Sequence, residues 1–201
     1  MKKASWVLVG ILATSIGLYP LTYFVLDREF GLLASKSAEL LSDNLWNIAF
    51  YGHILLGGLA LLIGWLQFND KWRRKNIKLH RTVGKTYVIA VLISGFCGLY
   101  IAVFATGGIA SILGFFSLGL VWLTTTILAY TAIKNGKLAL HQKFMIYSYA
   151  ACFAAVTLRI WLPTLTSLMG QFIGAYRIVA WLCWVPNIIV AYFIVRKIKT
   201  A

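Results

Sequence analysis

Residues 69–104 read NDKWRRKNIKLHRTVGKTYVIAVLISGFCGLYIAVF, and in them a strongly basic stretch leads directly into an apolar one. The apolar part, 83–104, carries no charged residue after Lys85. It has the roughly 20 residues that an α-helix, rising about 1.5 Å per residue, needs to cross the hydrocarbon core of a bilayer. The stretch therefore predicts a membrane-spanning helix with a cationic segment at one end.

The same pattern recurs along the chain. Five further apolar runs of similar length are separated by short polar segments: Trp6–Leu26, Asn47–Phe68, Ser111–Ile133, Phe144–Leu162 and Tyr176–Val195. Because backbone N–H and C=O groups must be paired inside lipid, each run is expected to be helical. No segment between the runs is long enough for a separate soluble domain. Residues 1–201 are therefore predicted to form a single all-α transmembrane domain, a polytopic bundle of six helices.

The composition supports this assignment. Of the 201 residues, 61% are hydrophobic, against about 45–50% in a typical soluble domain, and the mean hydropathy is +0.82. The formal net charge of +14 does not indicate nucleic-acid binding, because the Lys and Arg residues lie in short loops between the apolar runs. We therefore expect the lipid bilayer to be the main partner of the chain.

The distribution of Lys and Arg also predicts the orientation of the helices. Most of these residues lie in segments that alternating helices place on one side, namely Lys2 with Lys3, the stretch 71–85, the loop 134–143 and the tail 196–199. The other side holds few basic residues and most of the acidic ones; its charged residues are Asp27, Arg28, Glu29, Lys36, Glu39, Asp43, Arg159 and Arg177. Since basic loops stay in the cytoplasm, both termini are predicted to be cytoplasmic, in the plasma membrane.

Two of the three histidines, His80 and His141, lie at the cytoplasmic starts of the third and fifth predicted helices. Those helices run parallel, so the two imidazoles are expected at the same level of the membrane. A helix N-terminus disfavours the imidazolium, and the neutral imidazole is the form that ligates a metal or haem iron. Basic residues that could hold haem propionates lie nearby: Arg81, Lys85 and Lys143. The alternative is that both histidines only cap their helices at the interface.

The third histidine, His53, lies inside the second predicted helix, where an ionisable side chain is costly and usually faces other helices. It begins a helix face of small and polar residues that ends at Gln67. Candidate partners from the external half of the last two helices are Arg159 and Asn187. These four residues are the candidates for a ligand pocket. The alternative is that the small residues serve helix packing and that Arg159 extends to the interface.

Two prolines are predicted to alter the last two helices. Pro186 removes a backbone donor, so it should kink its helix and release the carbonyl of Leu182 next to Asn187. A kink beside a polar residue can line a cavity in a membrane protein. Pro163, by contrast, is expected to end the fifth helix.

No Asp or Glu lies within a predicted span, which argues against a conventional ion-coupled transporter.

Several short motifs occur together in this chain. They are Gly52-His53, Gln67-Phe68, His80-Arg81-x-x-Gly84-Lys85-x-Tyr87, His141-x-Lys143-Phe144-Met145, Leu158-Arg159 and Trp184-Val185-Pro186-Asn187. In this combination, residues 47–195 resemble the bacterial membrane-protein family named domain of unknown function 2306. Gln142 departs from the basic residue expected there. The family name implies no activity, but the resemblance implies that His53, His80, His141, Arg159 and Asn187 are the residues to test.

Three functions therefore remain open. The first is a cytochrome b-like redox protein that binds haem b through His80 and His141. The second is a protein that binds or transports a small molecule or lipid at an external-side pocket of His53, Arg159 and Asn187. The third is an accessory subunit of a membrane complex, with another membrane protein or a second copy as partner. The sequence assigns no catalytic residue and no dedicated metal site, and it leaves enzymatic activity open.

The orientation is testable by limited proteolysis. Trypsin added outside intact spheroplasts should leave the stretch 71–85 uncut, because that stretch is predicted to face the cytoplasm. Trypsin added to inverted membrane vesicles should cleave within it, and immunoblotting of the fragments distinguishes the two results. Cleavage from outside the cell would overturn the predicted orientation.

Overall fold

The structure is a computed structural model and describes residues 3–26 and 31–198. All regular secondary structure in these two ranges is helical, as the sequence predicts. Six stretches are long and apolar enough to cross a membrane: Ser5–Phe24, Asn44–Phe68, Ile77–Ala102, Ile109–Lys134, Leu138–Met169 and Phe172–Val195. The chain divides into two compact units, Met1–Ser94 and Gly95–Ala201. Each unit is described by itself below.

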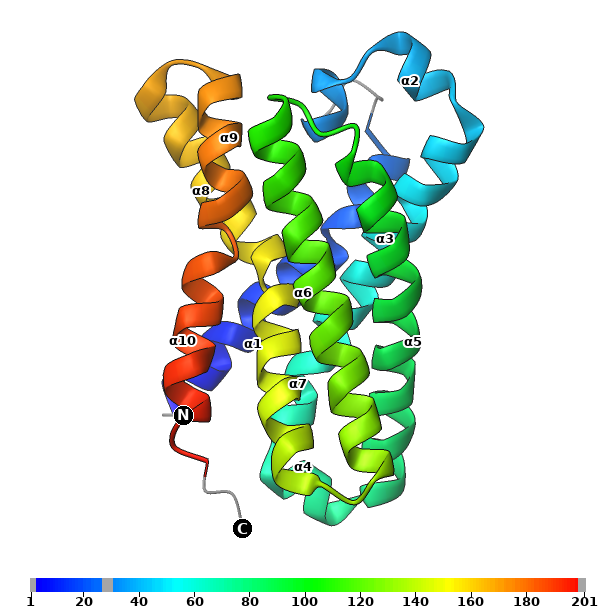
Figure 1. The fold of residues 1–201 in the computed structure, drawn as a ribbon, viewed down its shortest axis with the longest axis vertical. Helices are drawn as coiled ribbons and strands as arrows, with labels where there is room; N and C mark the ends of the chain where they lie inside the picture. The colour runs from blue at the N-terminus through cyan, green and yellow to red at the C-terminus, as the bar shows by residue number, and fades with distance from the viewer. Residues whose placement is uncertain (1–2, 27–30, 199–201) are drawn as a thin grey trace. The chain divides into compact units, whose positions relative to one another are not determined.

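In the first unit, α1 (Lys3–Leu18) continues as the 3₁₀-helix η1 (Tyr19–Phe24) and packs against α3 (Asn44–Gly64) (Figure 1). The two helices approach closely at Gly17 and Gly58. A Cβ atom on Gly58 would lie 2.6 Å from the carbonyl oxygen of Gly17. Membrane helices gain little from burying apolar side chains against each other, so close backbone contact of this kind stabilises their packing.

Short helices connect the spans of the first unit. The segment before α3 contains η2 (Gly31–Ser35) and α2 (Ala38–Ser42), and Asp43 caps α3 by accepting a hydrogen bond from the Leu45 amide at 2.8 Å. After α3, η3 (Trp65–Phe68) and α4 (Asp70–Lys75) lead into α5 (Ile77–Ala102). The predicted external charges Asp27, Arg28 and Glu29 lie outside the described residues.

In the second unit, α6 (Ile109–Lys134) and α7 (Leu138–Cys152) form an antiparallel hairpin (Figure 1). The chain continues as α8 (Ala154–Met169), α9 (Phe172–Leu182) and α10 (Val185–Val195). Helix α9 packs against both α6 and α8, whereas α10 packs against α7. The contact between α6 and α9 depends on Gly114, because a Cβ atom there would lie 2.8 Å from the Ala180 carbonyl oxygen.

The last two spans are each interrupted near the middle. Phe153 separates α7 from α8, and Cys183 with Trp184 separates α9 from α10. The second break follows from Pro186 in the first turn of α10, as the sequence predicts. The first break has no proline or glycine. There the Thr157 hydroxyl lies 3.3 Å from the Phe153 carbonyl and 3.2 Å from the Ala154 carbonyl.

The third and fifth spans have other boundaries than the sequence predicts, and the fifth begins at Leu138 rather than Phe144. Pro163 does not end the fifth span, because it lies inside α8, which runs to Met169 and ends at Gly170 in the left-handed conformation (φ +66°). Membrane helices tolerate an internal proline when surrounding groups satisfy the freed carbonyl. The third span begins at Ile77 rather than Val83, because Asn76 supplies a cap and Lys and Arg are good helix formers.

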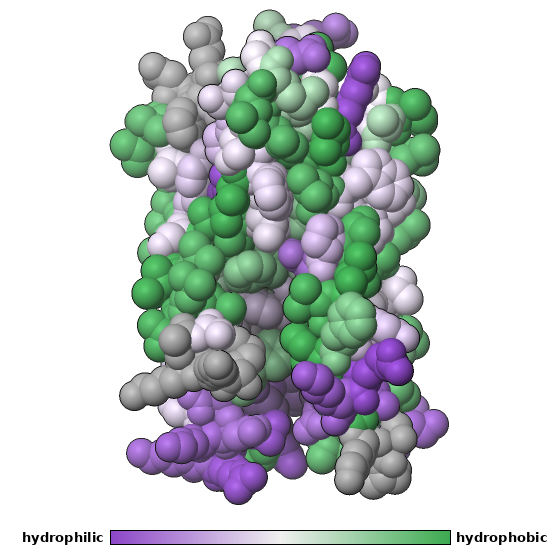
Figure 2. Space-filling model, turned by 90° about the vertical axis from the view of Figure 1, so that its left-hand side faces the viewer, coloured by the Kyte–Doolittle hydropathy of each residue, from purple (hydrophilic) through white to green (hydrophobic). Residues whose placement is uncertain are grey.

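The outer faces of the helices carry large apolar side chains. Examples are Ile48, Phe96 and Ile189, which are 70%, 62% and 51% exposed. Figure 2 shows patches of hydrophobic side chains over the middle of the displayed face and hydrophilic side chains gathered at its lower end. Such exposure is unusual for a protein in water and is what lipid contact requires.

Cys97, Cys152 and Cys183 are all free thiols.

The close approach of α1 and α3 makes a stability prediction. Gly58→Ala should destabilise the protein by about 1–3 kcal/mol, because the new methyl group would collide with the Gly17 backbone. Gly84→Ala on α5 is the matched control, since its nearest new contact would be an ordinary 3.8 Å from Gln67. The control should be neutral or stabilising by up to about 1 kcal/mol. Unfolding in detergent measures both variants, and equal stability of the two would contradict the prediction.

Candidate functional site

His53 is held between two helices of the first unit. Its Nδ1 atom lies 2.9 Å from the Ser94 carbonyl oxygen, and the Ser94 hydroxyl donates to the His53 carbonyl at 2.8 Å. Because a carbonyl oxygen only accepts, Nδ1 is the donor, and in the neutral ring Nε2 carries the lone pair. Ser94 is fully buried. The pair therefore joins α3 to α5 and fixes the orientation of the imidazole.

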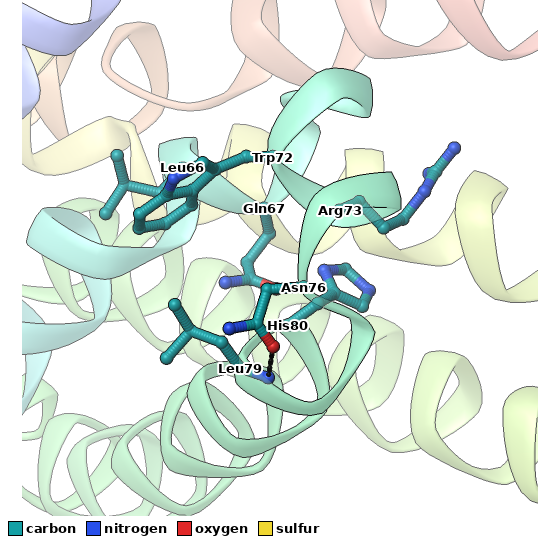
Figure 3. Close-up of a pocket in the computed structure, with 7 residues that line it drawn as sticks. All are labelled: Leu66, Gln67, Trp72, Arg73, Asn76, Leu79 and His80. Atoms are coloured by element: carbon teal, nitrogen blue, oxygen red, sulfur yellow. Dashed lines mark hydrogen bonds between the residues drawn. The ribbon is translucent and has the colours of Figure 1, made fainter.

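Gln67 and His80 line one pocket in the first unit. The pocket is small, with a volume of about 10 Å³, and is bordered by residues of η3, α4 and the start of α5: Leu66, Gln67, Trp72, Arg73, Asn76, Leu79 and His80. Figure 3 shows the Gln67 side chain extending toward Asn76. The sequence had assigned Gln67 and His80 to two different candidate sites. The structure brings them together because the short helix α4 folds the chain back between them.

Two asparagines shape this pocket. Asn69 caps α4 by accepting from the Trp72 amide at 3.1 Å, and Asn76 caps α5 by accepting from the Leu79 amide at 2.9 Å. The guanidinium of Arg73 pairs with Asp70 at 2.7 Å and points away from the pocket in Figure 3. The proposed propionate-binding residues Arg81 and Lys85 are exposed on α5.

His141 is oriented by its own helical hairpin in the second unit. Its Nδ1 atom donates to the Ala129 carbonyl oxygen of α6 at 2.9 Å. The neutral ring therefore has its lone pair on Nε2, as a metal-ligating imidazole does when Nδ1 is bonded to a carbonyl. Both His141 and the nearby Lys143 are half-buried.

Asn187 connects the two interrupted spans. Its amide nitrogen donates to the Cys183 carbonyl at 3.0 Å, to the Thr157 hydroxyl at 3.2 Å and to the Ala150 carbonyl at 3.3 Å. The Thr157 hydroxyl in turn donates to the Cys183 carbonyl. Cys183 stands at the break caused by Pro186, so side chains satisfy a carbonyl there that a regular helix would pair with a backbone amide.

Arg159 lies on a different side of α8 from Thr157. Its Nη1 atom donates to the Ala155 carbonyl one turn earlier at 3.0 Å. Residues two apart in a helix do not face the same way, so Arg159 does not join the cluster of Asn187 and Thr157.

One shifted titratable group lies outside the spans. Burial lowers the pKa of Lys36, in the segment between η2 and α2, to about 8, because removal from water disfavours the ammonium.

Sequence reasoning missed the polar partners of the candidates. Ser94 and Thr157 were not singled out, nor was the buried pair of Thr126 and Ser148, whose hydroxyls lie 2.6 Å apart between α6 and α7. The sequence does show hydroxyl residues inside apolar spans. Such residues often donate to a carbonyl of their own helix, so the sequence does not reveal which residue of another helix they contact. Among the described residues, no three His, Cys, Asp or Glu side chains are grouped to hold a metal ion.

Comparison with known proteins adds the family. Residues 50–195 match the family described as "Predicted membrane protein (DUF2306)", which is more than half of the chain. Searches found no match among curated proteins and none among solved structures. The matched range contains all three histidines and both interrupted spans. The chain therefore belongs to the DUF2306 family of predicted membrane proteins, as the resemblance in its motifs indicated.

Proposed function

We propose that this multi-pass membrane protein acts in the plasma membrane, where it binds or transports a small polar or amphipathic molecule that contacts Asn187. The observation that carries the proposal is the position of the Asn187 amide nitrogen, whose two hydrogens are shared among acceptors on Cys183, Thr157 and Ala150. These bonds hold the amide in one orientation, and its carbonyl oxygen Oδ1 then points elsewhere as an available acceptor.

The surroundings of Asn187 support a binding role. Interrupted helices at membrane depth are a common way to build a substrate site in transporters, because helix ends supply polar groups within an apolar protein. An acceptor such as Oδ1 selects a ligand with an O–H or N–H donor, for example a hydroxyl or amine. Arg159 remains a candidate for an acidic group of the ligand. His53 and Gln67, in the first unit, remain sequence-based candidates.

This proposal predicts a loss of ligand response. Small alcohols, amines and lysophospholipids are screened for a shift in the melting temperature of the detergent-purified protein. The shift produced by a binding compound should disappear in Asn187→Leu, which keeps the side-chain size but removes the acceptor. Thr164→Val is the control, because Thr164 lies on the same helix as Thr157 but bonds only to that helix, at the Ile160 carbonyl. An equal shift in Asn187→Leu and the wild type would overturn the proposal.

The polar cluster should also contribute to stability. Thr157→Val keeps the shape of the side chain but removes the hydroxyl that links Asn187 to Cys183. It should lower the free energy of unfolding by about 1–3 kcal/mol, because a buried carbonyl loses a donor. Thr164→Val should change it by less than about 0.5 kcal/mol, since Thr164 is exposed. Similar values for the two variants would contradict a structural role for the cluster.

A second candidate function is haem binding. The observation that favours it is the Nδ1 bond of His141 to Ala129, which leaves Nε2 in the form that ligates iron. In this proposal the His141 imidazole would hold the haem iron, and His80 remains a candidate from the sequence alone. Arg81, Lys85 and Lys143 are the proposed partners of the propionates. Bound haem would supply one-electron redox chemistry.

The absorption spectrum tests this second candidate. Protein purified from haem-supplemented cells should show a Soret band that shifts on reduction. The band should be lost in His141→Ala and retained in His53→Ala, whose imidazole also bonds through Nδ1 and is therefore a matched control. A colourless wild-type preparation, or equal haem content in the two variants, would exclude haem ligation by His141.

A further inference from the structure

The two breaks in the last two spans lie side by side in the second unit. Thr157, near the start of α8, donates to the carbonyl of Cys183 at the break between α9 and α10. The amide nitrogen of Asn187, in the first turn of α10, lies 3.2 Å from the Thr157 hydroxyl and 3.3 Å from the carbonyl of Ala150 in α7. The chain between the breaks is therefore joined to α7 and α10 at two adjacent points.

The segment between the breaks is a helical hairpin whose two arms pack on each other. Helix α8 ends at Gly170, where the chain turns in the left-handed conformation, and α9 returns beside it (Figure 1, gold and orange). The arms share a buried cluster that includes Ala154 of α8 and Val179 of α9. Because both breaks lie at the same end of this packed pair, a rotation about them moves the hairpin as one body.

Away from the breaks, two side chains of α9 attach the hairpin to the start of α6. The Nε atom of Arg177 donates to the Gly107 carbonyl at 2.6 Å, and Nε1 of Trp181 donates to the Ala110 carbonyl at 3.1 Å. Residues four apart share one helix face, so both donors reach α6 from the same side of α9. Both side chains are exposed, so water or lipid headgroups can replace these bonds. The attachment is therefore reversible.

Movement of the hairpin would uncover groups that are buried at the breaks. Cys183, at the second break, has no exposed surface, and Asn187 beside it is half-buried. Cys97, by contrast, lies on α5, outside the hairpin, and is already partly exposed. The Cys183 thiol therefore reports on the hairpin, whereas Cys97 reports on the rest of the second unit.

We propose that the α8–α9 hairpin is a hinged lid, which turns about the breaks at Phe153 and Cys183 and is latched to α6 by Arg177 and Trp181. The helices are already interrupted at both hinges, so a change of angle there disturbs few backbone hydrogen bonds. The lid is a property of the second unit by itself. It does not depend on the proposed ligand, although its opening would give a ligand access to Asn187.

Thiol labelling of the full-length protein in detergent tests the proposal. Two parent proteins keep either Cys183 or Cys97 as the single cysteine, and mass spectrometry follows their reaction with N-ethylmaleimide. A buried thiol reacts only when the structure opens locally, so the Cys183 rate measures how often the lid is open. Arg177→Met and Trp181→Phe remove the latch donors and keep most of the side-chain volume. Each should raise the Cys183 rate about threefold to tenfold, the change expected for the loss of one hydrogen bond.

Trp161→Phe is the matched control, because Trp161 lies on α8 of the same hairpin and is 39% exposed, against 40% for Trp181. It should change the Cys183 rate by less than about twofold, as expected for a surface substitution. The proposal is overturned if Arg177→Met and Trp181→Phe label Cys183 at the parent's rate, or if Trp161→Phe accelerates it as much as Trp181→Phe does. An equal acceleration at Cys97 would also overturn it, because the whole unit would then have loosened.

Discussion

Hydrocarbon neither donates nor accepts hydrogen bonds, so every backbone N–H and C=O group that enters it must find a partner within the protein. In this chain the requirement is met by helices throughout residues 3–26 and 31–198. It also determines how the helices meet, because burying an apolar side chain against another helix gains little when lipid is the alternative. Close approach at Gly17, Gly58 and Gly114 supplies packing contacts instead.

The same requirement explains where polar side chains occur inside the spans. Pro186 lies in the first turn after the break in the last span, and at that break the carbonyl of Cys183 accepts hydrogen bonds from Thr157 and Asn187. Ser94 and His53 exchange bonds with each other's backbone between α3 and α5. In each case a side chain that is costly to bury is retained with its hydrogen bonds made to the protein. Such groups are held rigidly, which is also what a specific ligand contact needs.

Polar groups at the ends of the spans follow a different rule. Around α4 and the start of α5, water and lipid headgroups are within reach, so side chains need not complete all of their bonds within the protein. Asn76, for example, is exposed and uses only its oxygen in capping α5.

The sequence alone determined that the chain has six helices that can span a membrane. Length and hydrophobicity are properties of each segment by itself, so they do not depend on how the segments pack together. It also located the break at Pro186, since proline acts on its own helix. Tertiary structure alone decided that Gln67 lies beside His80, that Ser94 fixes His53, and that Thr157 meets Asn187. These pairings depend on how each helix is rotated about its axis and where it bends. The sequence of an apolar span does not determine its rotation, because almost any of its faces can contact lipid. The continuation of α8 through Pro163 has the same origin, because packing around a helix decides whether a proline ends it.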